Sequence, residues 1–302
     1  MSAPAPAAPT DAPPAFVLAA MPGLFVLLWS TGFIGAKLGM PYVEPFTFLL
    51  LRFALLTVIL VVVALIFRAP WPATRAEFVR IGVVGLLVHG VYLGGVFSSL
   101  HAGLSAGVAA LIVGLQPLLT AVGAGYVLGE KVSFRQWVGL VLGLVGVALV
   151  VGDKLSLGGQ GSVDASAIAF AVVALLGITV GTLYQKRHGG AMDLRSGSAI
   201  QYAVAAVPVA ILALIFESGE VEWSGELIFA LSWLVVVLSL GAISLLYILI
   251  RRGAAAKVAS LFYLTPPVVA LIAWGLFDEM LTPFAMVGMG VVVIGVALVT
   301  KK

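Results

Sequence analysis

Residues 106–150 read AGVAALIVGLQPLLTAVGAGYVLGEKVSFRQWVGLVLGLVGVALV, and much of this stretch recurs 149 positions later without a gap. In the second copy Pro117 becomes Pro266, and the closing GVALV returns unchanged near the carboxyl terminus. Carrying the same offset backwards pairs Lys37 with Lys186, so the repeat extends over the whole chain. A period near half the length of an apolar chain is typical of a membrane protein built by duplication.

The composition places the chain in a lipid bilayer. Hydrophobic residues make up 62% of it and charged residues 10%, against about 45–50% and about 25% in soluble domains. The net charge of +3 is ordinary for a protein with several cytoplasmic loops and does not indicate nucleic-acid binding. The chain has no cysteine, which excludes a disulfide framework and a thiolate metal site.

The apolar spans fall into two sets of five, and a helix needs about 20 residues to cross the hydrocarbon core. We expect them at 16–39, 45–67, 78–100, 104–128 and 134–152, and again at 165–187, 194–216, 227–250, 254–277 and 283–300. Segments this long without polar and apolar alternation are helices rather than barrel strands. The predicted fold class is therefore an all-α membrane protein with ten transmembrane helices.

The duplication also predicts the domain boundaries. We expect a first five-helix repeat at 16–152, a linker loop at 153–164 and a second repeat at 165–300. A disordered tail rich in proline and alanine, 1–15, precedes them and lacks the positive charge of a signal peptide.

Five spans per half is an odd number, so the second repeat enters the membrane from the opposite side and the repeats are inverted. Orientation follows from Lys and Arg, which collect in cytoplasmic loops. Of the 16 such residues, Arg52 and Lys257 fall inside spans, Lys37 and Lys154 fall on one side, and the other twelve fall on the side of the amino terminus. Both termini are therefore expected in the cytoplasm.

Several short motifs resemble those of the drug/metabolite transporter superfamily. They are the run Trp29-Ser30-Thr31-Gly32-Phe33, the step Leu51-Arg52-Phe53, the mid-helix Pro117, the sequence LGE at 128–130 and the glycine-spaced helix that ends in GVALV. The second copy departs from LGE, with Phe277-Asp278-Glu279 in its place. Within the superfamily the chain is most similar to the ten-helix EamA-like exporters, including the bacterial aromatic amino-acid exporter. The resemblance implies two inverted five-helix repeats that export small metabolites across the inner membrane.

Inverted-repeat transporters bind substrate near the middle of the membrane, where broken helices expose backbone polar groups. Counting along the spans places four features at this level, namely Trp29, His89, Gln116-Pro117 and Pro266-Pro267. Each proline lacks an amide donor and clashes with the carbonyl four residues earlier, so we expect helix breaks that line the transport path. A kink satisfied by a neighbouring helix is the alternative, and it stays open.

His89 and Tyr92 share one face of the third span by the three-and-four spacing. An ionisable residue inside a membrane is costly and indicates a functional site. We therefore expect His89 to contact substrate together with Gln116. A neutral histidine that only joins two helices is the alternative.

Five aromatic residues are expected to line a cavity that accepts flat apolar side chains, namely Trp29, Phe33, Tyr92, Phe262 and Tyr263. Tyr184 and Tyr247 belong to the same set, but they lie near the cytoplasmic ends of their spans, where we favour a role as bilayer anchors. Aromatic residues are also common as bilayer anchors and as core, so both interpretations stay open.

Two cations lie inside the spans. Lys257, one turn into the ninth span, either contacts substrate or extends its ammonium group to the interface. Arg52 is replaced by Gln201 in the other copy, and for Arg52 we favour a structural hydrogen-bonding role.

The chain carries no motif for ATP binding or for bond cleavage. It lacks GxxxxGK[ST], HExxH and GxSxG, and all thirteen Asp and Glu fall in the tail, in loops or at helix ends. We expect no enzyme activity, cofactor or metal. A buried His89 is expected to be mostly neutral at cytoplasmic pH, because burial disfavours the charged ring. Because no group in the middle of the membrane is then available to carry a proton or an ion, we expect the substrate's own gradient to drive export.

The predicted function is export of small amphipathic metabolites, above all aromatic and neutral amino acids, by alternating access without a coupled ion. The expected partners are the lipid bilayer and the small-molecule substrate, with no nucleic acid. Efflux of drugs or nucleoside-like compounds, with proton coupling, is the alternative within transport. An intramembrane enzyme lacks the acid–base pairs it needs, and a helical scaffold has no use for polar residues in the middle of the membrane.

Overall fold

A computed structural model of the chain describes residues 15–128, 133–156, 164–188, 192–242, 261–279 and 282–300, with positions 245 and 249. The tail predicted at 1–15 lies almost entirely outside the described residues, and so do Tyr247 and Lys257. Tyr263 is described as part of a helical turn, but its side chain is outside the described set.

The described residues are helical, apart from one isolated bridge between Val43 and Val221. The first half contains α1 (Ala15–Gly39), α2 (Pro45–Ile66), α3 (Arg75–Gly85), the π-helix η1 (Leu86–Val91), α4 (Tyr92–His101), α5 (Ala106–Val113), α6 (Gln116–Leu128) and α7 (Phe134–Ser156). The second half contains α8 (Ala165–His188), α9 (Leu194–Phe216), α10 (Gly225–Ser232), the π-helix η2 (Trp233–Ala242), the short 3-10 helix η3 (Phe262–Leu264), α13 (Thr265–Phe277) and α14 (Pro283–Thr300). The prediction of an all-helical fold is confirmed for the described residues.

Seven helical segments in the described part of the chain are long and apolar enough to cross a membrane, and three shorter apolar helices accompany them. One of the seven, Arg75–His101, runs through α3, η1 and α4 without interruption. Large apolar side chains are exposed on the outside of the bundle, for example Leu214 at 84% and Phe216 at 71%. Such a surface is stable against lipid, where apolar side chains lose nothing by exposure.

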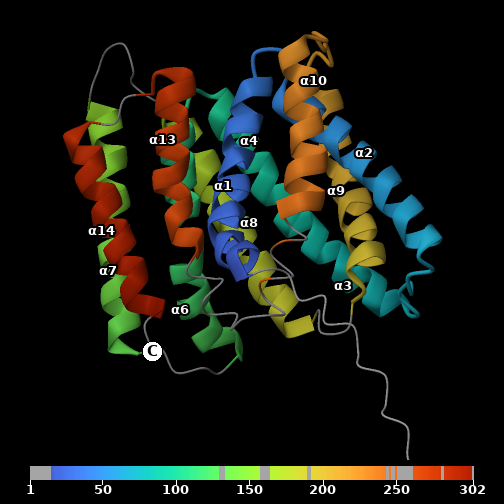
Figure 1. Ribbon diagram of the computed structural model, residues 1–302, viewed down its shortest axis with the longest axis horizontal. Coiled ribbons are helices and arrows are strands. Elements are labelled where there is room, and N and C mark those ends of the chain that lie inside the picture. The colour runs from blue at the N-terminus through green and yellow to red at the C-terminus, as the bar shows by residue number, and fades with distance from the viewer. Residues whose placement is uncertain are drawn as a thin grey trace, which may run out of the picture.

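Helices at equivalent positions in the two halves pack against each other. α2 lies along α9 and α7 lies along α14, and these two pairs make the most extensive contacts among the described helices. Figure 1 shows them at opposite ends of the bundle, with α7 and α14 on the left and α2 and α9 on the right. The positions in each pair differ by the 149-residue offset, since α2 begins at Pro45 and α9 at Leu194.

Both pairs are antiparallel. Glycines bring α7 and α14 together, because a Cβ atom on Gly146 would lie 2.6 Å from the carbonyl oxygen of Gly288. The reciprocal contact joins the other ends, since a Cβ atom on Gly295 would lie 2.7 Å from the carbonyl oxygen of Gly139. Because Gly146 and Gly295 are offset partners, as are Gly139 and Gly288, the contact is self-complementary in the way a two-fold axis requires.

Polar contacts fasten the end of the bundle that is uppermost in Figure 1, where α1 and α13 end and α10 begins. Lys37 near the end of α1 forms an ion pair with Glu279, just beyond α13, and lies 5.1 Å from the centre of the Phe277 ring. Glu279 also accepts a hydrogen bond from the amide of Ala106 at the start of α5, at 3.3 Å. The ends of α1, α5 and α13 are therefore held at one point.

A second set of contacts at this end joins the start of α2 to the end of α9. The carboxylate of Glu217 accepts hydrogen bonds from the amides of Phe46 and Thr47, at 2.6 and 2.7 Å. The carboxylate of Glu44 accepts from the amide and the hydroxyl of Ser218, both at 2.7 Å. These hydrogen bonds hold the pKa of the Glu44 carboxyl below its ordinary value of 4.5.

Candidate functional site

Two adjoining cavities lie in the middle of the bundle. The first, which we call the histidine cavity, has a volume of about 100 Å³. It is lined by Trp29, Gly32, Phe33, Arg52, Val88, His89, Tyr92, Leu93, Val96, Phe97, Ile178, Tyr202 and Leu238. The second, the glutamine cavity, has a volume of about 50 Å³. It is lined by Trp29, Phe33, Tyr92, Ala110, Val113, Gly114, Gln116, Pro117, Ile178, Phe262 and Thr265.

A π-helical turn in the third span positions His89. Residues of η1 lie against α8 at two glycines, because a Cβ atom on Gly177 would lie 2.8 Å from Val91 and one on Gly181 would lie 2.6 Å from Val88. π-Helical turns inside α-helices occur frequently at functional sites, where they change the direction of the side chains. Here the turn carries His89, and the α-helix resumes at Tyr92.

The imidazole of His89 is held by α9. Its Nε2 lies 3.3 Å from Oε1 of Gln201, and its ring stacks on Tyr202 with a centroid distance of 4.1 Å and an interplanar angle of 22°. Phe53 approaches the imidazole edge-on at 6.2 Å. His89 therefore lines the cavity and joins α9, so the substrate-contacting and structural interpretations both have a geometric basis.

Arg52 enters the same cavity from α2. The residue is 3% exposed, and its NH2 group donates a hydrogen bond of 3.0 Å to the hydroxyl of Ser239 on η2. Ser239 in turn donates to the carbonyl of Leu234, at 2.9 Å. The hydrogen bond between Arg52 and Ser239 agrees with the structural role favoured from the sequence, although Arg52 also lines the histidine cavity.

Both proline positions coincide with helix breaks. α5 ends at Val113 and α6 begins at Gln116, so Pro117 lies in the first turn of a new helix. In the second half η3 ends at Leu264 and α13 begins at Thr265, with Pro266 in its first turn. Proline is well tolerated there, because the amide that it lacks has no intrahelical partner in a first turn.

The two breaks meet at the glutamine cavity. A Cβ atom on Gly114 would lie 3.0 Å from Cγ of Pro266, so the backbone at the first break touches the proline of the second. Pro266 is buried, whereas Pro267 beside it is partly buried. Gln116 donates to Thr120 at 3.0 Å and to Thr182 at 3.4 Å.

Thr265 adds an unpaired polar group to the glutamine cavity. It is 6% exposed, and its Oγ1 has no hydrogen-bond partner among the described residues. A buried hydroxyl without a partner is unfavourable by about 1–3 kcal/mol, so this wall of the cavity favours a polar ligand.

Aromatic rings form the shared wall of the two cavities. Trp29 packs edge-on against Phe262 at 5.0 Å, and Phe25 supports both rings at 5.6 and 5.3 Å. Phe33 and Tyr92 complete this wall and line both cavities. Such rings provide flat apolar surface for a ligand.

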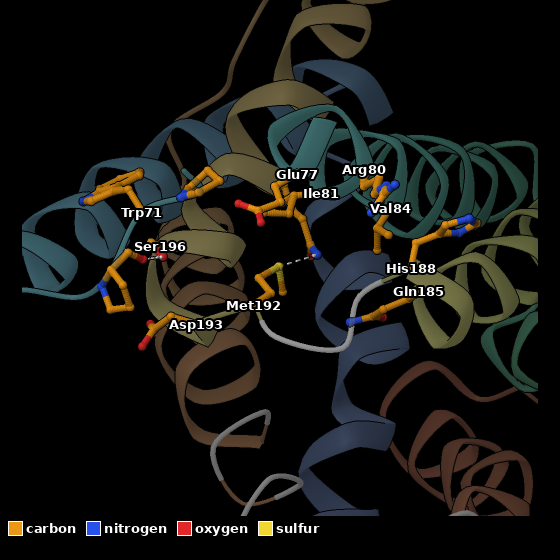
Figure 2. A pocket seen from close by; sticks show the side chains of 13 residues that line it. Trp71, Glu77, Arg80, Ile81, Val84, Gln185, His188, Met192, Asp193 and Ser196 are labelled. Carbon is orange, nitrogen blue, oxygen red and sulfur yellow. Dashed lines mark hydrogen bonds between the residues drawn. The ribbon is translucent and has the colours of Figure 1, made fainter. Parts of the chain in front are cut away.

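A larger cavity of about 380 Å³, which we call the vestibule, opens near the end of the bundle opposite to the Lys37–Glu279 ion pair. Figure 2 shows its walls, with Glu77 and Arg80 from α3, and Gln185 and His188 from the end of α8. Gln201 also lines the vestibule, and Gln201 contacts His89 in the histidine cavity. Gln201 therefore links a wall of the vestibule to the histidine cavity through its contact with His89.

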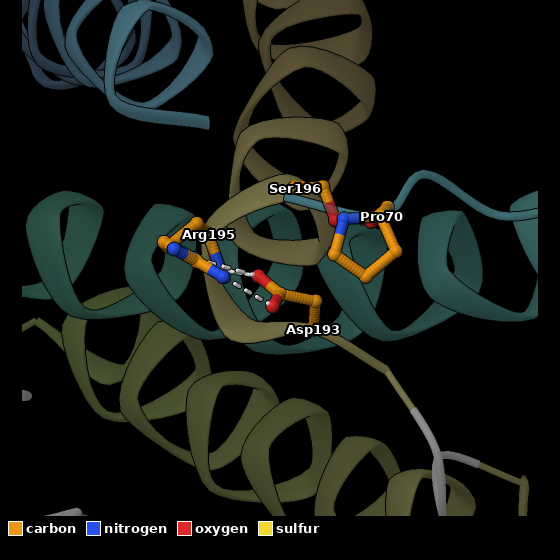
Figure 3. A network of polar contacts seen from close by, with 4 residues as sticks. All are labelled: Pro70, Asp193, Arg195 and Ser196. Carbon is orange, nitrogen blue, oxygen red and sulfur yellow. Dashed lines mark hydrogen bonds and ion pairs between the residues drawn. The ribbon is translucent and has the colours of Figure 1, made fainter. Parts of the chain in front are cut away.

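The start of α9 at the edge of the vestibule is fixed by a local polar network. Figure 3 shows Asp193 facing Arg195, and the hydroxyl of Ser196 donating to the carbonyl of Pro70 at 2.5 Å. Asp193 accepts from the amide, Nε and NH2 of Arg195 at 2.9, 3.1 and 2.8 Å. These hydrogen bonds, with those of the side chain contributing most, hold the pKa of Asp193 below its ordinary value.

The structure brings together most of the residues selected from the sequence. Those that meet around the two cavities are Trp29, Phe33, His89, Tyr92, Gln116 and Pro117, with Pro266 directly behind Gly114. Sequence reasoning missed Tyr202, which stacks on His89, and Ile178, which lines both cavities. The 149-residue offset could have identified Tyr202, because it pairs the Arg52-Phe53 step, which belongs to the family motif, with Gln201-Tyr202.

Together, long apolar helices, broken helices near the middle of the bundle and a small polar and aromatic cavity define a multi-pass membrane transporter. A sequence model of the EamA-like transporter family matches this chain twice, at residues 17–152 and 165–301. The chain belongs to the EamA-like transporter family, within the drug/metabolite transporters.

Relatives of similar length are described as transporters. The chain is 27% identical over 286 residues to the uncharacterized transporter YvbV of Bacillus subtilis, covering 92% of this chain and 89% of YvbV. It is 27% identical over 279 residues to the uncharacterized inner membrane transporter YedA of Escherichia coli K12, covering 91% and 87%. A probable amino-acid metabolite efflux pump of the same bacterium is 25% identical over 284 residues, covering 90% and 91%.

A protein of known crystal structure has the same fold. The two structures superpose with a TM-score of 0.65 over 94% of this chain and 98% of the other, at 19% sequence identity. The match extends over both halves of the chain.

Proposed function

We propose that this transporter exports small amphipathic metabolites, above all aromatic and neutral amino acids, across the inner membrane by alternating access. The observation that carries the proposal is the central site, in which polar groups and aromatic rings line two adjoining cavities beside two helix breaks. The relative described as a probable amino-acid metabolite efflux pump supports the substrate class, and the EamA-like family supports transport.

Ten helices in two inverted five-helix repeats form the proposed architecture, with the repeats at 16–152 and 165–300. The antiparallel packing of equivalent helices supports this architecture. If one copy is inverted relative to the other, each helix runs opposite to its counterpart, as α2 does to α9 and α7 does to α14. The unequal distribution of Lys and Arg supports cytoplasmic termini. In this orientation the Lys37–Glu279 ion pair lies at the outer end and the vestibule faces the cytoplasm.

An amino acid of this class fits the chemistry of the two cavities. The histidine cavity offers Arg52, His89 and tyrosines to a polar head group, and the glutamine cavity offers aromatic surface to a side chain. Both cavities are smaller than the ~300 Å³ of a typical ligand pocket. The surrounding helices must therefore separate to admit a whole substrate. Gln201 lines the vestibule and contacts His89, so a substrate that enters from the vestibule passes beside it in this proposal.

Transport without a coupled ion is the proposed mode. Neither central cavity is lined by a carboxylate among the described residues, so the group that most often carries a proton or holds sodium is absent from their walls. His89 is the remaining candidate for proton transfer, and burial favours its neutral form. The substrate gradient then drives net flux, as suits release of a metabolite that has accumulated.

Counterflow in proteoliposomes tests the proposal, with labelled aromatic and neutral amino acids and with nucleosides as the comparison panel. We expect exchange of amino acids at a rate that a pH step, a sodium gradient or a protonophore leaves unchanged. Exchange of nucleosides alone would replace the substrate class by the alternative. Accumulation driven by a pH gradient, and lost in His89→Ala, would identify proton coupling through His89 instead.

A further inference from the structure

Arg52 is a buried cation with one hydrogen-bond partner among the described residues. Only its NH2 group is bonded, to the hydroxyl of Ser239, and its buried Nε has no partner among the described residues. In the same part of the chain no carboxylate forms an ion pair with it. The guanidinium stays protonated at any physiological pH, so its charge persists at 3% exposure.

The described side chains around Arg52 do not neutralise this charge. The titratable groups close to Arg52 are His89, Tyr92 and Tyr202. Tyrosine is neutral near pH 7, and histidine is either neutral or cationic. Ser239 holds the guanidinium in position, but its hydroxyl carries no charge and its proton is used on Leu234.

A buried charge without a counter-ion is strongly unfavourable. A guanidinium can bind a carboxylate by donating two parallel hydrogen bonds to its oxygens. Arg52 lines the histidine cavity, where its unbonded Nε leaves part of that hydrogen-bonding edge available. The cavity therefore combines a positive charge with aromatic walls, which suits a ligand that has an acidic head and a flat apolar body.

We propose that Arg52 binds the carboxylate of the transported molecule, so that substrates of this transporter must carry a carboxylate. The assignment rests on the proposed function for the position of the transport site, and it narrows the substrate class to amino acids and related acids. An ammonium group of the same molecule can lie against the faces of Trp29 or Tyr92, which are attractive to cations. Neutral drugs and simple amines lack the group that Arg52 requires.

The test is binding to the purified full-length protein in detergent, measured by calorimetry. Four probes share one ring and differ in their charged groups: phenylalanine, 3-phenylpropionate, phenylalaninamide and phenethylamine. We expect the wild-type protein to bind the two acids, phenylalanine and 3-phenylpropionate, about 10- to 100-fold more tightly than phenylalaninamide and phenethylamine, which lack the carboxylate. This ratio corresponds to a difference of about 1.4 to 2.8 kcal/mol in binding free energy. In Arg52→Gln, which installs the residue of the other repeat, we expect this preference to disappear.

Matched variants separate binding from folding. Arg75→Gln removes the same charge from an exposed position at the start of α3, and we expect it to keep the preference. Arg52→Lys keeps the charge but loses the forked geometry, so we expect weaker binding with the preference for acids retained. If Arg52→Gln does not fold, the comparison of the four probes on wild-type protein and on Arg52→Lys still decides.

Equal affinity of wild-type protein for the two acids and for the two amines without a carboxylate overturns the proposal, and so does failure to bind either acid. A preference that survives in Arg52→Gln likewise returns Arg52 to a structural role. The exporter proposal fails separately: proteoliposomes that exchange no amino acid, combined with Arg52-dependent binding of 3-phenylpropionate, would leave the carboxylate site standing.

Discussion

In the proposed orientation, the Lys37–Glu279 ion pair is expected to hold the outer end of the transporter closed. Glu279 contacts Lys37 on α1 and the amide of Ala106 on α5, so one carboxylate fastens three helix ends. The perturbation is Glu279→Gln, which removes the negative charge while leaving a carbonyl oxygen that still accepts from Ala106. In the altered protein the outer ends of α1 and α13 should separate more often.

The expected magnitude follows from how deeply the pair is buried. The side chains of Lys37 and Glu279 are 29% and 13% exposed. Surface ion pairs contribute about 0–1 kcal/mol, and loss of one partner from a buried pair costs about 3–5 kcal/mol. A pair between these limits, partly screened by water, is worth about 1–2 kcal/mol. At 1.4 kcal/mol for each factor of ten, we expect the outward-open population to rise about 5- to 30-fold.

Labelling of a single cysteine measures this population, because the chain contains no native cysteine. Val96 lines the histidine cavity on α4 and is 3% exposed, so Val96→Cys reacts with a membrane-impermeant maleimide only when the outer end opens. We expect Glu279→Gln to raise the labelling rate of this cysteine from outside by the same factor. Glu220→Cys, in an exposed loop, serves as the control that should label equally in both backgrounds.

Equal labelling rates at Val96→Cys with and without Glu279→Gln would refute this reasoning. A double-mutant cycle with Lys37→Gln tests whether the effect belongs to the pair, because the second substitution should then add little to the first. The exchanged pair Lys37→Glu with Glu279→Lys should restore slow labelling in part. Raised salt should reduce the difference, since both groups retain some contact with water.

The repeat supplies an internal comparison for the same experiment. The 149-residue offset relates Lys37 to Lys186 and Glu279 to Glu130, which lies outside the described residues. If the repeats are inverted, these counterparts lie at the cytoplasmic end. We therefore expect Glu130→Gln to leave labelling of Val96→Cys from outside unchanged or slower, because it favours opening towards the cytoplasm.

Three further predictions test other parts of the molecule. Pro117→Ala and Pro266→Ala should reach the membrane in normal amounts but transport slowly, because continuous helices close the breaks that line the glutamine cavity; expression and counterflow are measured together. His89→Ala should weaken substrate binding about tenfold with an unchanged melting temperature, whereas unfolding would favour the structural histidine. The pKa of the Glu44 carboxyl is lowered in the folded protein, so its contact with Ser218 stabilises the fold above pH 4.5. This stabilisation is lost as the pH falls through the pKa of Glu44 in the folded state. Glu44→Gln should therefore make the melting temperature less sensitive to acid, as measured by thermal unfolding at a series of pH values.

The sequence was sufficient to predict a helical membrane protein and helix breaks at both proline positions, because these depend on hydrophobicity and on the missing proline amide. It could not predict the π-helical turn at η1, which packs against glycines of α8 more than 80 positions away. It also gave Arg52 a structural role only. That no carboxylate among the described residues pairs with Arg52 is a property of the packed bundle, because no local sequence pattern records which side chains surround a buried guanidinium.

The two repeats make nearly equivalent polar contacts at the central site, but with different side chains. Arg52 of the first copy bonds Ser239, and Gln201, its counterpart in the second copy, contacts His89. The 149-residue offset pairs Ser239 with Gly90, which is the residue next to His89. The Arg52–Ser239 and Gln201–His89 contacts therefore join nearly equivalent positions of the two copies. A shared framework of two copies therefore presents a cation from one side and an imidazole and an amide from the other. A symmetric site would bind a symmetric ligand equally in two orientations, whereas this arrangement gives a ligand with one acidic end a single preferred orientation.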